Sequence, residues 1–286
     1  MAEKSIHELL EFGIINIDKS SGPTSFSVSD FICKKIGARK TSHFGTLDPK
    51  VTGVLPVALN RACKLTGYFL GEDKTYVGIM RIHENTDINK IREIIEKKFI
   101  GKINQMPPVK SRVKRQLRPR EIYSFELLEQ SDDKKDILFR VKCEGGTYIR
   151  KLIDDLGSEL GIGAHMLELR RTDAGIFGEE NSANLYDFEK AVEEYKNGDD
   201  RLLKKIIIPA EEAIKEVYPC VEIKDDNLKQ IFTGRPIYRK DVVRDEGWKN
   251  DSVVGVFYNG KFIGMYKISR GREIFAKPEF VFQPIK

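Results

Sequence analysis

The sequence predicts an α+β protein of two domains, a larger one that mixes strands with helices and a small β-rich one after it. Up to about residue 216, alternating apolar runs typical of strands are interspersed with runs of helical spacing. After Tyr218-Pro219 the pattern changes to short strands and turns, and Asn259-Gly260 between two alternating runs indicates a hairpin. We therefore expect domains at 1–216 and 217–286, and the sequence leaves open whether residues 1–12 pack on the second.

Local patterns define the elements in order. Capping side chains begin two helices, one from Thr24 or Ser25 to about Ile36 and one from Asp87 to about Phe99. Phe26 is expected among the apolar positions of the first helix. Further helices are expected at 148–160, 188–195 and 209–217, and strands at 13–17, 75–82, 121–128, 137–143, 167–174, 253–258, 261–268 and 280–284.

The bulk composition excludes several classes of protein. The four cysteines are scattered without C-x-x-C spacing, which argues against a zinc site and a disulfide scaffold and favours a reducing, cytoplasmic compartment. His43 and His165 also lack the spacing of metal ligands, so we expect no metal. No apolar run reaches membrane-spanning length, so no membrane partner is expected. A net charge of +5 does not by itself indicate nucleic-acid binding.

The segment 42–57 is the most informative part of the chain, because it places one carboxylate, Asp48, between a glycine and a proline. Pro49 forces the residue before it into extended geometry. Gly45 and Gly53 allow the backbone to pass close to another group. We therefore expect Asp48 on a stiff turn that faces a large partner. The alternative is that Asp48 caps a helix beginning at Pro49.

Three other segments carry residues that could take part in binding or catalysis. Tyr76 begins a strand, with Lys74 close enough to attract phosphate, although a tyrosine on a strand is also a common packing residue. Arg150 lies in the first turn of a helix, where the helix dipole disfavours a cation. It therefore needs an anionic partner, either elsewhere in the chain or one turn on at Asp154. Leu169 precedes two arginines and a threonine.

The segment 110–120 is strongly basic and contains no acidic residue. A one-sided charge run is often a solvated surface, but beside two prolines it also fits a track for a nucleic-acid backbone. The expected phosphate contacts are Lys110, Arg112, Lys114, Arg115 and Arg118, together with Lys74.

Taken together, these motifs resemble the TruB/dyskerin family of RNA pseudouridine synthases. The resemblance follows family order over roughly residues 13–177, and it departs from the family pattern at Ser20 and Ser42. A looser likeness makes the chain after residue 217 similar to a PUA domain, a small RNA-binding module. The matching segments are Asn16-Ile17-Asp18-Lys19, Gly22-Pro23-Thr24-Ser25, 43–56, Lys74-Thr75-Tyr76, Gln105-Met106-Pro107-Pro108, 146–150, 163–166 and Leu169-Arg170-Arg171-Thr172.

The resemblance implies a fold and a set of roles. The fold would be a mixed, mostly antiparallel sheet flanked by helices, followed by the PUA domain. Asp48 matches the catalytic aspartate, Tyr76 the tyrosine that stacks on the flipped base, and Arg150 the arginine that pairs with the aspartate. Leu169 matches an apolar wall of the uracil pocket, and His43 a histidine near the flipped nucleotide. Isomerising uridine changes no oxidation state, so no cofactor is expected.

The length of one connection distinguishes two branches of this family. Between Pro108 and Glu121-Ile122-Tyr123 the chain contains only the basic segment. It lacks the insertion that the bacterial-type enzymes carry there. This resembles the archaeal-type dyskerin branch, in which an H/ACA guide RNA selects uridines and small accessory proteins complete the particle. The implied partners are guide RNA with rRNA, tRNA or both. One alternative is a stand-alone, guide-free tRNA pseudouridine synthase, and a second is a non-catalytic scaffold of an RNA particle.

Overall fold

The structure is a computed structural model that describes residues 4–108, 113–224, 228–244, 247–269 and 271–284. Its chain divides into two compact units, Ile14–Ile207 on one side and Met1–Gly13 with Ile208–Lys286 on the other. The boundary expected near residue 216 stays a prediction, and the structure groups the helix α8 (Ala210–Val217) with the C-terminal unit. Among the described residues, none of the helices combines the length and apolar character that crossing a membrane requires.

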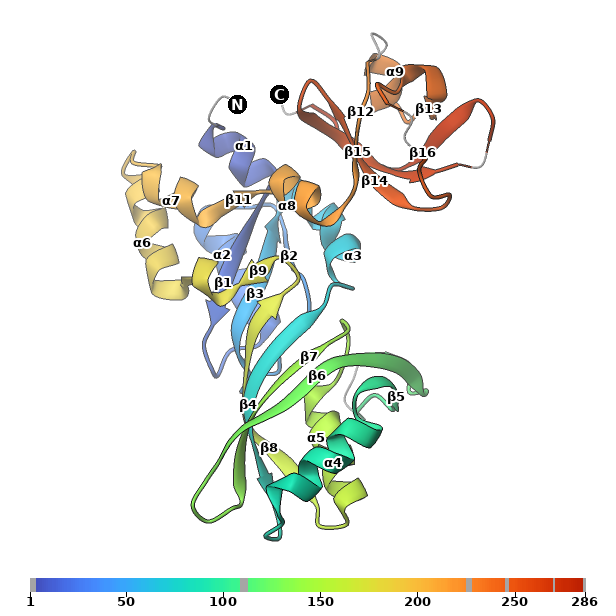
Figure 1. Cartoon of the computed structure of the whole chain (residues 1–286). Helices are drawn as coiled ribbons and strands as arrows, with labels where there is room; N and C mark the ends of the chain where they lie inside the picture. Colours follow the sequence, from blue (N-terminus) through green and yellow to red (C-terminus); the bar gives the residue numbers. More distant parts are fainter. Residues whose placement is uncertain (1–3, 109–112, 225–227, 245–246, 270, 285–286) are drawn as a thin grey trace. The chain divides into compact units, whose positions relative to one another are not determined.

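A large mixed sheet forms the centre of the unit Ile14–Ile207 (Figure 1), with the order β10-β1-β3-β8-β4-β7-β6-β5. Along this path β1–β10 and β3–β8 pair in parallel and the other neighbours are antiparallel, so the expected α+β class with a mostly antiparallel sheet is confirmed. The strands are β1 (Gly13–Lys19), β2 (Thr41–His43), β3 (Thr52–Leu59), β4 (Lys74–Ile82), β5 (Gly101–Gln105), β6 (Arg118–Gln130), β7 (Asp136–Cys143), β8 (Ala164–Ala174), β9 (Phe177–Gly178), β10 (Ala183–Asn184) and β11 (Ile207–Pro209).

Helices pack on both halves of this sheet, α2 against β2 and β3, and α4 and α5 against β6 and β8 (Figure 1). Caps explain where two of them begin, since Thr24 accepts a hydrogen bond from Ser27 N and Asp87 accepts one from Asn89 N. The helical elements are α2 (Ser25–Ile36), η1 (Asn60–Leu65), α3 (Thr66–Phe69), α4 (Ile88–Lys98), α5 (Ile149–Leu160), η2 (Glu179–Asn181), α6 (Leu185–Lys196) and α7 (Arg201–Ile206).

Two strands were missed in the sequence, and two expectations about these elements are wrong. Strands β3 and β5 were not expected, and β3 is buried on nearly every residue, so it shows no alternation that a pattern search would find. Phe26 is 71% exposed, because α2 instead turns Ser25, Val28 and Ile32 inward. In the C-terminal unit the last strand runs from Ile274 to Val281 rather than over 280–284, because its first half pairs with two neighbouring strands.

The C-terminal unit contains a five-stranded sheet of its own, with the order β12-β14-β15-β16-β13. The expected hairpin joins β14 to β15, and positive φ at Asn259 (48°) and Gly260 (71°) fits a type I′ turn. Phe12 stacks on Phe262 with 5.4 Å between ring centroids, so the N-terminal segment packs within this unit. Its elements are α1 (Ile6–Glu11), β12 (Cys220–Glu222), α9 (Leu228–Phe232), β13 (Ile237–Tyr238), η3 (Arg239–Asp241), β14 (Val253–Tyr258), β15 (Lys261–Ile268) and β16 (Ile274–Val281), together with α8.

The parallel pair β3–β8 joins the two halves of the large sheet through very few residues. Its register aligns Thr52 with Arg170 and Gly53 with Arg171. Gly53 has a φ of +100°, and a Cβ there would lie 2.1 Å from the carbonyl oxygen of Arg171. The close approach expected from Gly53 is therefore confirmed, and it is the backbone of β8 that passes it.

Candidate active site

Asp48 lies in the loop between β2 and β3, at the first position of a tight turn. The Val51 amide donates a hydrogen bond to the Asp48 carbonyl at 3.0 Å, and residues 49–50 form the turn rather than a helix. The alternative that Asp48 caps a helix is therefore wrong. About half of the Asp48 side chain is exposed, so its carboxylate faces solvent at the surface of the unit.

The partner that Arg150 requires is Asp48, 102 residues earlier in the chain. An Arg150 Nη2–H donates to Asp48 Oδ2, and the two groups form an ion pair. Asp154, the alternative partner, instead accepts from Lys151 Nζ at 2.8 Å. Arg150 follows the first residue of α5, and Tyr148 caps that helix without a side-chain hydrogen bond. The turn at 145–146 thus places the Arg150 guanidinium at the Asp48 loop.

Tyr76 and Leu169 lie side by side on one face of the sheet. Tyr76 is buried on β4, and Gly78, two residues on, shares its face. A Cβ on Gly78 would lie 2.8 Å from Leu169 Cδ1, so the Leu169 side chain covers that glycine. Burial raises the pKa of Tyr76, the Arg171 guanidinium opposes this through its charge and a hydrogen bond, and the Asp48 charge adds to the increase. Tyr76 therefore lies within electrostatic range of Asp48.

His43 ends β2 at the entrance to the same loop. Its Nε2 lies 3.3 Å from Thr46 Oγ1, and the ring is partly exposed. Asp48, Arg150, Tyr76, Leu169 and His43 thus come from five separate elements or loops of one compact unit.

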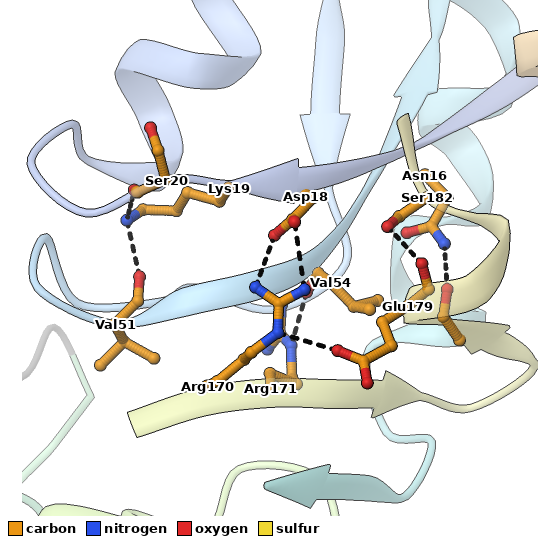
Figure 2. Close-up of polar contacts among 11 residues, drawn as sticks. Asn16, Asp18, Lys19, Ser20, Val51, Val54, Arg170, Arg171, Glu179 and Ser182 are labelled. Atoms are coloured by element: carbon orange, nitrogen blue, oxygen red, sulfur yellow. Dashed lines mark hydrogen bonds and ion pairs between the residues drawn. The ribbon is translucent and has the colours of Figure 1, made fainter. Parts of the chain in front are cut away.

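Lys19 is a buried cation that binds the backbone at the end of the Asp48 loop, and Figure 2 shows its contacts with Ser20 and Val51. Its side chain is fully buried, and Nζ donates to the carbonyl oxygens of Ser20 (2.9 Å), Pro49 (2.9 Å) and Val51 (2.7 Å). Burial lowers the pKa of Lys19, and the negative charge of Asp48 opposes that decrease. No local pattern marks this role, because a lysine at the end of a strand ordinarily faces solvent.

Two consecutive arginines of β8 tie it to the other half of the sheet (Figure 2). Arg170 donates to both carboxylate oxygens of Asp18, at 2.9 and 3.1 Å, and to Glu179 at 2.8 Å. Arg171 is 1% exposed, and its Nε donates to the carbonyl of Val54 at 2.7 Å. These contacts reinforce the short β3–β8 seam, which joins the strand after the Asp48 loop to the strand that carries Leu169.

The role expected of Lys74 does not fit the structure. Lys74 is 4% exposed, and its Nζ donates to the carbonyls of Leu70, at 2.9 Å, and of Glu72. A strand start usually exposes a lysine, but here the preceding loop folds back over the ammonium group. Lys74 therefore supports this loop and offers no charge to a phosphate.

Burial, with added repulsion from Arg171, lowers the pKa of Lys74 to about 8, from an ordinary value of 10.5. Between these two values the unfolded chain binds more protons than the native one, so stability rises with pH across the window and is constant below it. The free energy of unfolding should increase by about 2–3 kcal/mol more in the wild type than in Lys74→Met between pH 7.5 and pH 10. Urea unfolding at both pH values measures this, and parallel pH profiles would refute the assignment.

The structure describes only some of the basic residues that were expected to contact RNA phosphates. Lys110 and Arg112 lie outside the described residues. Lys114 and Arg115 are exposed, and Arg118 begins β6 with its Nη2 3.5 Å from the Lys114 carbonyl oxygen. Within the described part of the chain, no group of three histidine, cysteine, aspartate or glutamate residues could hold a metal ion.

Comparison with known families identifies the class of protein. A model described as "TruB family pseudouridylate synthase (N terminal domain)" matches residues 34–149. A second, "tRNA pseudouridylate synthase B C-terminal domain", matches residues 150–215. The chain belongs to the TruB family of pseudouridine synthases. This TruB-family protein is therefore an RNA isomerase, which confirms the resemblance noted in the sequence.

Curated TruB-family relatives cover most of the chain. The protein of Methanopyrus kandleri named "Probable tRNA pseudouridine synthase B" is 42% identical over 257 residues, which are 89% of this chain and 75% of the relative. The protein of the same name from Methanococcus aeolicus is 45% identical over 240 residues, 84% of this chain and 71% of the relative.

Solved structures similar to this TruB-family chain agree over nearly its whole length. One, "Crystal Structure of a Cbf5-Nop10-Gar1 Complex", has a TM-score of 0.89 at 38% identity and covers 98% of this chain and 88% of the matched one. Another, "Structure of H/ACA RNP bound to a substrate RNA containing 2'-deoxyuridine", has a TM-score of 0.88 at 35% identity with the same coverage.

Proposed function

We propose that this enzyme converts uridines selected by an H/ACA guide RNA into pseudouridine, with Asp48 as the catalytic carboxylate. The observation that carries the proposal is the ion pair of Asp48 with Arg150. Tyr76, whose pKa the Asp48 charge affects, lies on the same face of the sheet as Leu169. A carboxylate can act at the glycosidic bond, and an aromatic ring can stack on a uracil base.

The chemistry assigns each group a task. The bond between uracil N1 and ribose C1′ breaks, the base turns, and a bond forms between C5 and C1′ while the C5 proton leaves and N1 gains one. The reaction needs no oxidant or reductant. Asp48 acts at this bond, and the ion pair with the Arg150 guanidinium orients its carboxylate. His43 lies at the loop entrance, where the nucleotide arrives.

The base reaches this site only if its nucleotide leaves the stacked RNA, which costs a few kcal/mol. Stacking of the flipped base on Tyr76 offsets roughly 1–3 kcal/mol of that cost. Leu169 covers the adjacent glycine and supplies the apolar wall. Lys114, Arg115 and Arg118 follow the RNA backbone, with Lys110 and Arg112 assigned from sequence alone. The C-terminal five-stranded sheet serves as a PUA-type RNA-binding domain.

Two observations favour guided action. The connection between β5 and β6 spans only residues 106–117, which leaves no room for a folded insertion that grips a tRNA arm. The similar structures are of Cbf5 with Nop10 and Gar1 and of an H/ACA particle with substrate RNA, which supports guide RNA and small accessory proteins as partners. The relatives named tRNA pseudouridine synthase B favour a second candidate, guide-free action on tRNA.

A reconstitution experiment separates these candidates. The purified protein is incubated with a tRNA transcript alone, and with a target RNA plus a matching H/ACA guide RNA and the accessory proteins, and pseudouridine is mapped at single-nucleotide resolution. We expect product at the guided uridine only when the guide is present. Efficient turnover of bare tRNA without product in the guided reaction would establish the guide-free alternative. Absence of product from every RNA would favour the scaffold alternative.

A further inference from the structure

The residue before Asp48 is held by a buried hydroxyl group. Ser25, the first residue of α2, is 1% exposed. Its Oγ accepts a hydrogen bond from the Leu47 amide at 2.8 Å and donates one to the Leu47 carbonyl at 2.9 Å. Both main-chain polar groups of Leu47 are therefore fixed to the start of a helix.

The beginning of the same loop is held from the opposite half of the sheet. An Arg171 Nη2–H donates to the Gly45 carbonyl at 3.1 Å, while Nε binds the carbonyl of Val54. Gly45 has a φ of +111°, and a Cβ there would lie 3.3 Å from Arg171 Nη1, so the glycine permits the close approach. Arg171 also pairs in register with Tyr76 on β4. Arg171 thus binds the Asp48 loop through its guanidinium and pairs through its backbone with the strand that carries Tyr76.

The ion pair between Asp48 and Arg150 cannot by itself hold Asp48 in a fixed position. Both of its side chains are at least half exposed, and ion pairs between exposed groups stabilise a geometry by roughly 0–1 kcal/mol. A displacement of about 1 Å at a reacting group can lower a rate by about 100-fold. The position of Asp48 must therefore come mainly from its backbone, which Ser25 and Arg171 hold on either side.

We propose that Ser25 and Arg171 are positioning residues, which set Asp48 opposite Arg150 and Tyr76 without touching the substrate. The inference rests on the proposed catalytic role of Asp48. It predicts that losing either contact lowers the rate of the chemical step while RNA affinity is retained, because the RNA-facing side chains remain in place.

Ser25→Ala tests the first contact, and Ser29→Ala is its matched control. Ser29 lies one turn later on the same helix, is also buried, and donates to Thr41 Oγ1 rather than to the Asp48 loop. In a single-turnover assay of the reconstituted complex we expect the Ser25 variant to be about 10- to 100-fold slower. The Ser29 variant should stay within about twofold of wild type, and both should bind RNA normally. Equal rates for the two variants, at equal thermal stability, would overturn the proposal.

Arg171→Lys and Arg170→Lys provide a second matched pair if the serine variant folds poorly. Arg171 donates from two separate nitrogens, Nε to Val54 and Nη2 to Gly45, and lysine lacks this fork of donors, whereas Arg170 contacts Asp18 and Glu179 outside the loop. We expect a rate loss of at least about tenfold for the first and little for the second. Wild type and Asp48→Asn are assayed in parallel. If wild type is inactive or Asp48→Asn is active, the proposed function fails; if they behave as expected and the 171 variant keeps its rate, only the positioning role fails.

Discussion

Asp48→Asn is expected to abolish pseudouridine formation, with a single-turnover rate at least about 10⁴-fold below wild type. Asparagine keeps the size of the side chain and can still accept a hydrogen bond from Arg150. It carries no negative charge, so it can act neither as nucleophile nor as base at the glycosidic bond. RNA affinity should stay within about twofold, because the loop backbone and the surrounding side chains are unchanged.

Asp154→Asn is the control for this substitution. Asp154 lies one turn after Arg150 on the same helix, is exposed, and pairs with Lys151. It carries the same charge near the same site, so a general electrostatic effect would appear in both variants. We expect the Asp154 variant to retain full activity. More than about a tenth of wild-type product from the Asp48 variant would remove Asp48 from the chemistry.

Gly53→Ala is expected to destabilise the protein by roughly 3–5 kcal/mol. The new Cβ would lie 2.1 Å from the Arg171 carbonyl oxygen and 2.9 Å from its nitrogen, so the β3–β8 seam would have to open. The positive φ of Gly53 adds backbone strain for any residue with a side chain. Urea unfolding monitored by circular dichroism measures the loss, and catalytic activity should fall with it because this seam joins β3, which follows the Asp48 loop, to β8, which pairs with the strand of Tyr76.

Gly22→Ala is the control that separates the steric clash of the new Cβ from the strain of a positive φ. Gly22 has a similar φ of +113°, but a Cβ there would meet no atom within 4 Å. The free energy of unfolding of this variant should therefore fall only by the cost of backbone strain, about 1–2 kcal/mol. If the two alanine variants were equally stable, the close approach of β3 and β8 would not constrain the fold as the structure indicates.

Local chemistry explains why much of the fold was predictable. The caps at Thr24 and Asp87 mark helix starts that the structure reproduces, and Asn259-Gly260 forms the expected hairpin turn. The requirement of Arg150 for an anionic partner also followed from its place in the helix, since a cation opposes the dipole there. The partner's distance along the chain, 102 residues, had no local signal and came only from the family likeness.

The missed features depend on burial that no short window of sequence reveals. Strand β3 is covered on both faces, so its apolar residues do not alternate. Lys19 and Lys74 both have the sequence character of exposed residues, yet each is buried with its ammonium group bound to main-chain carbonyls. Contacts to carbonyl groups leave no trace in residue identity, because every residue offers one.

The most direct test of this account is a crystal structure of the Asp48→Asn protein assembled with guide RNA, accessory proteins and a target RNA. We predict a uridine flipped out of the RNA, with its base against Tyr76 and Leu169 and its C1′ facing residue 48. A target uridine that stays stacked in the RNA, or whose base binds away from the Asp48 loop, would contradict the central claim that this loop is the site of the reaction.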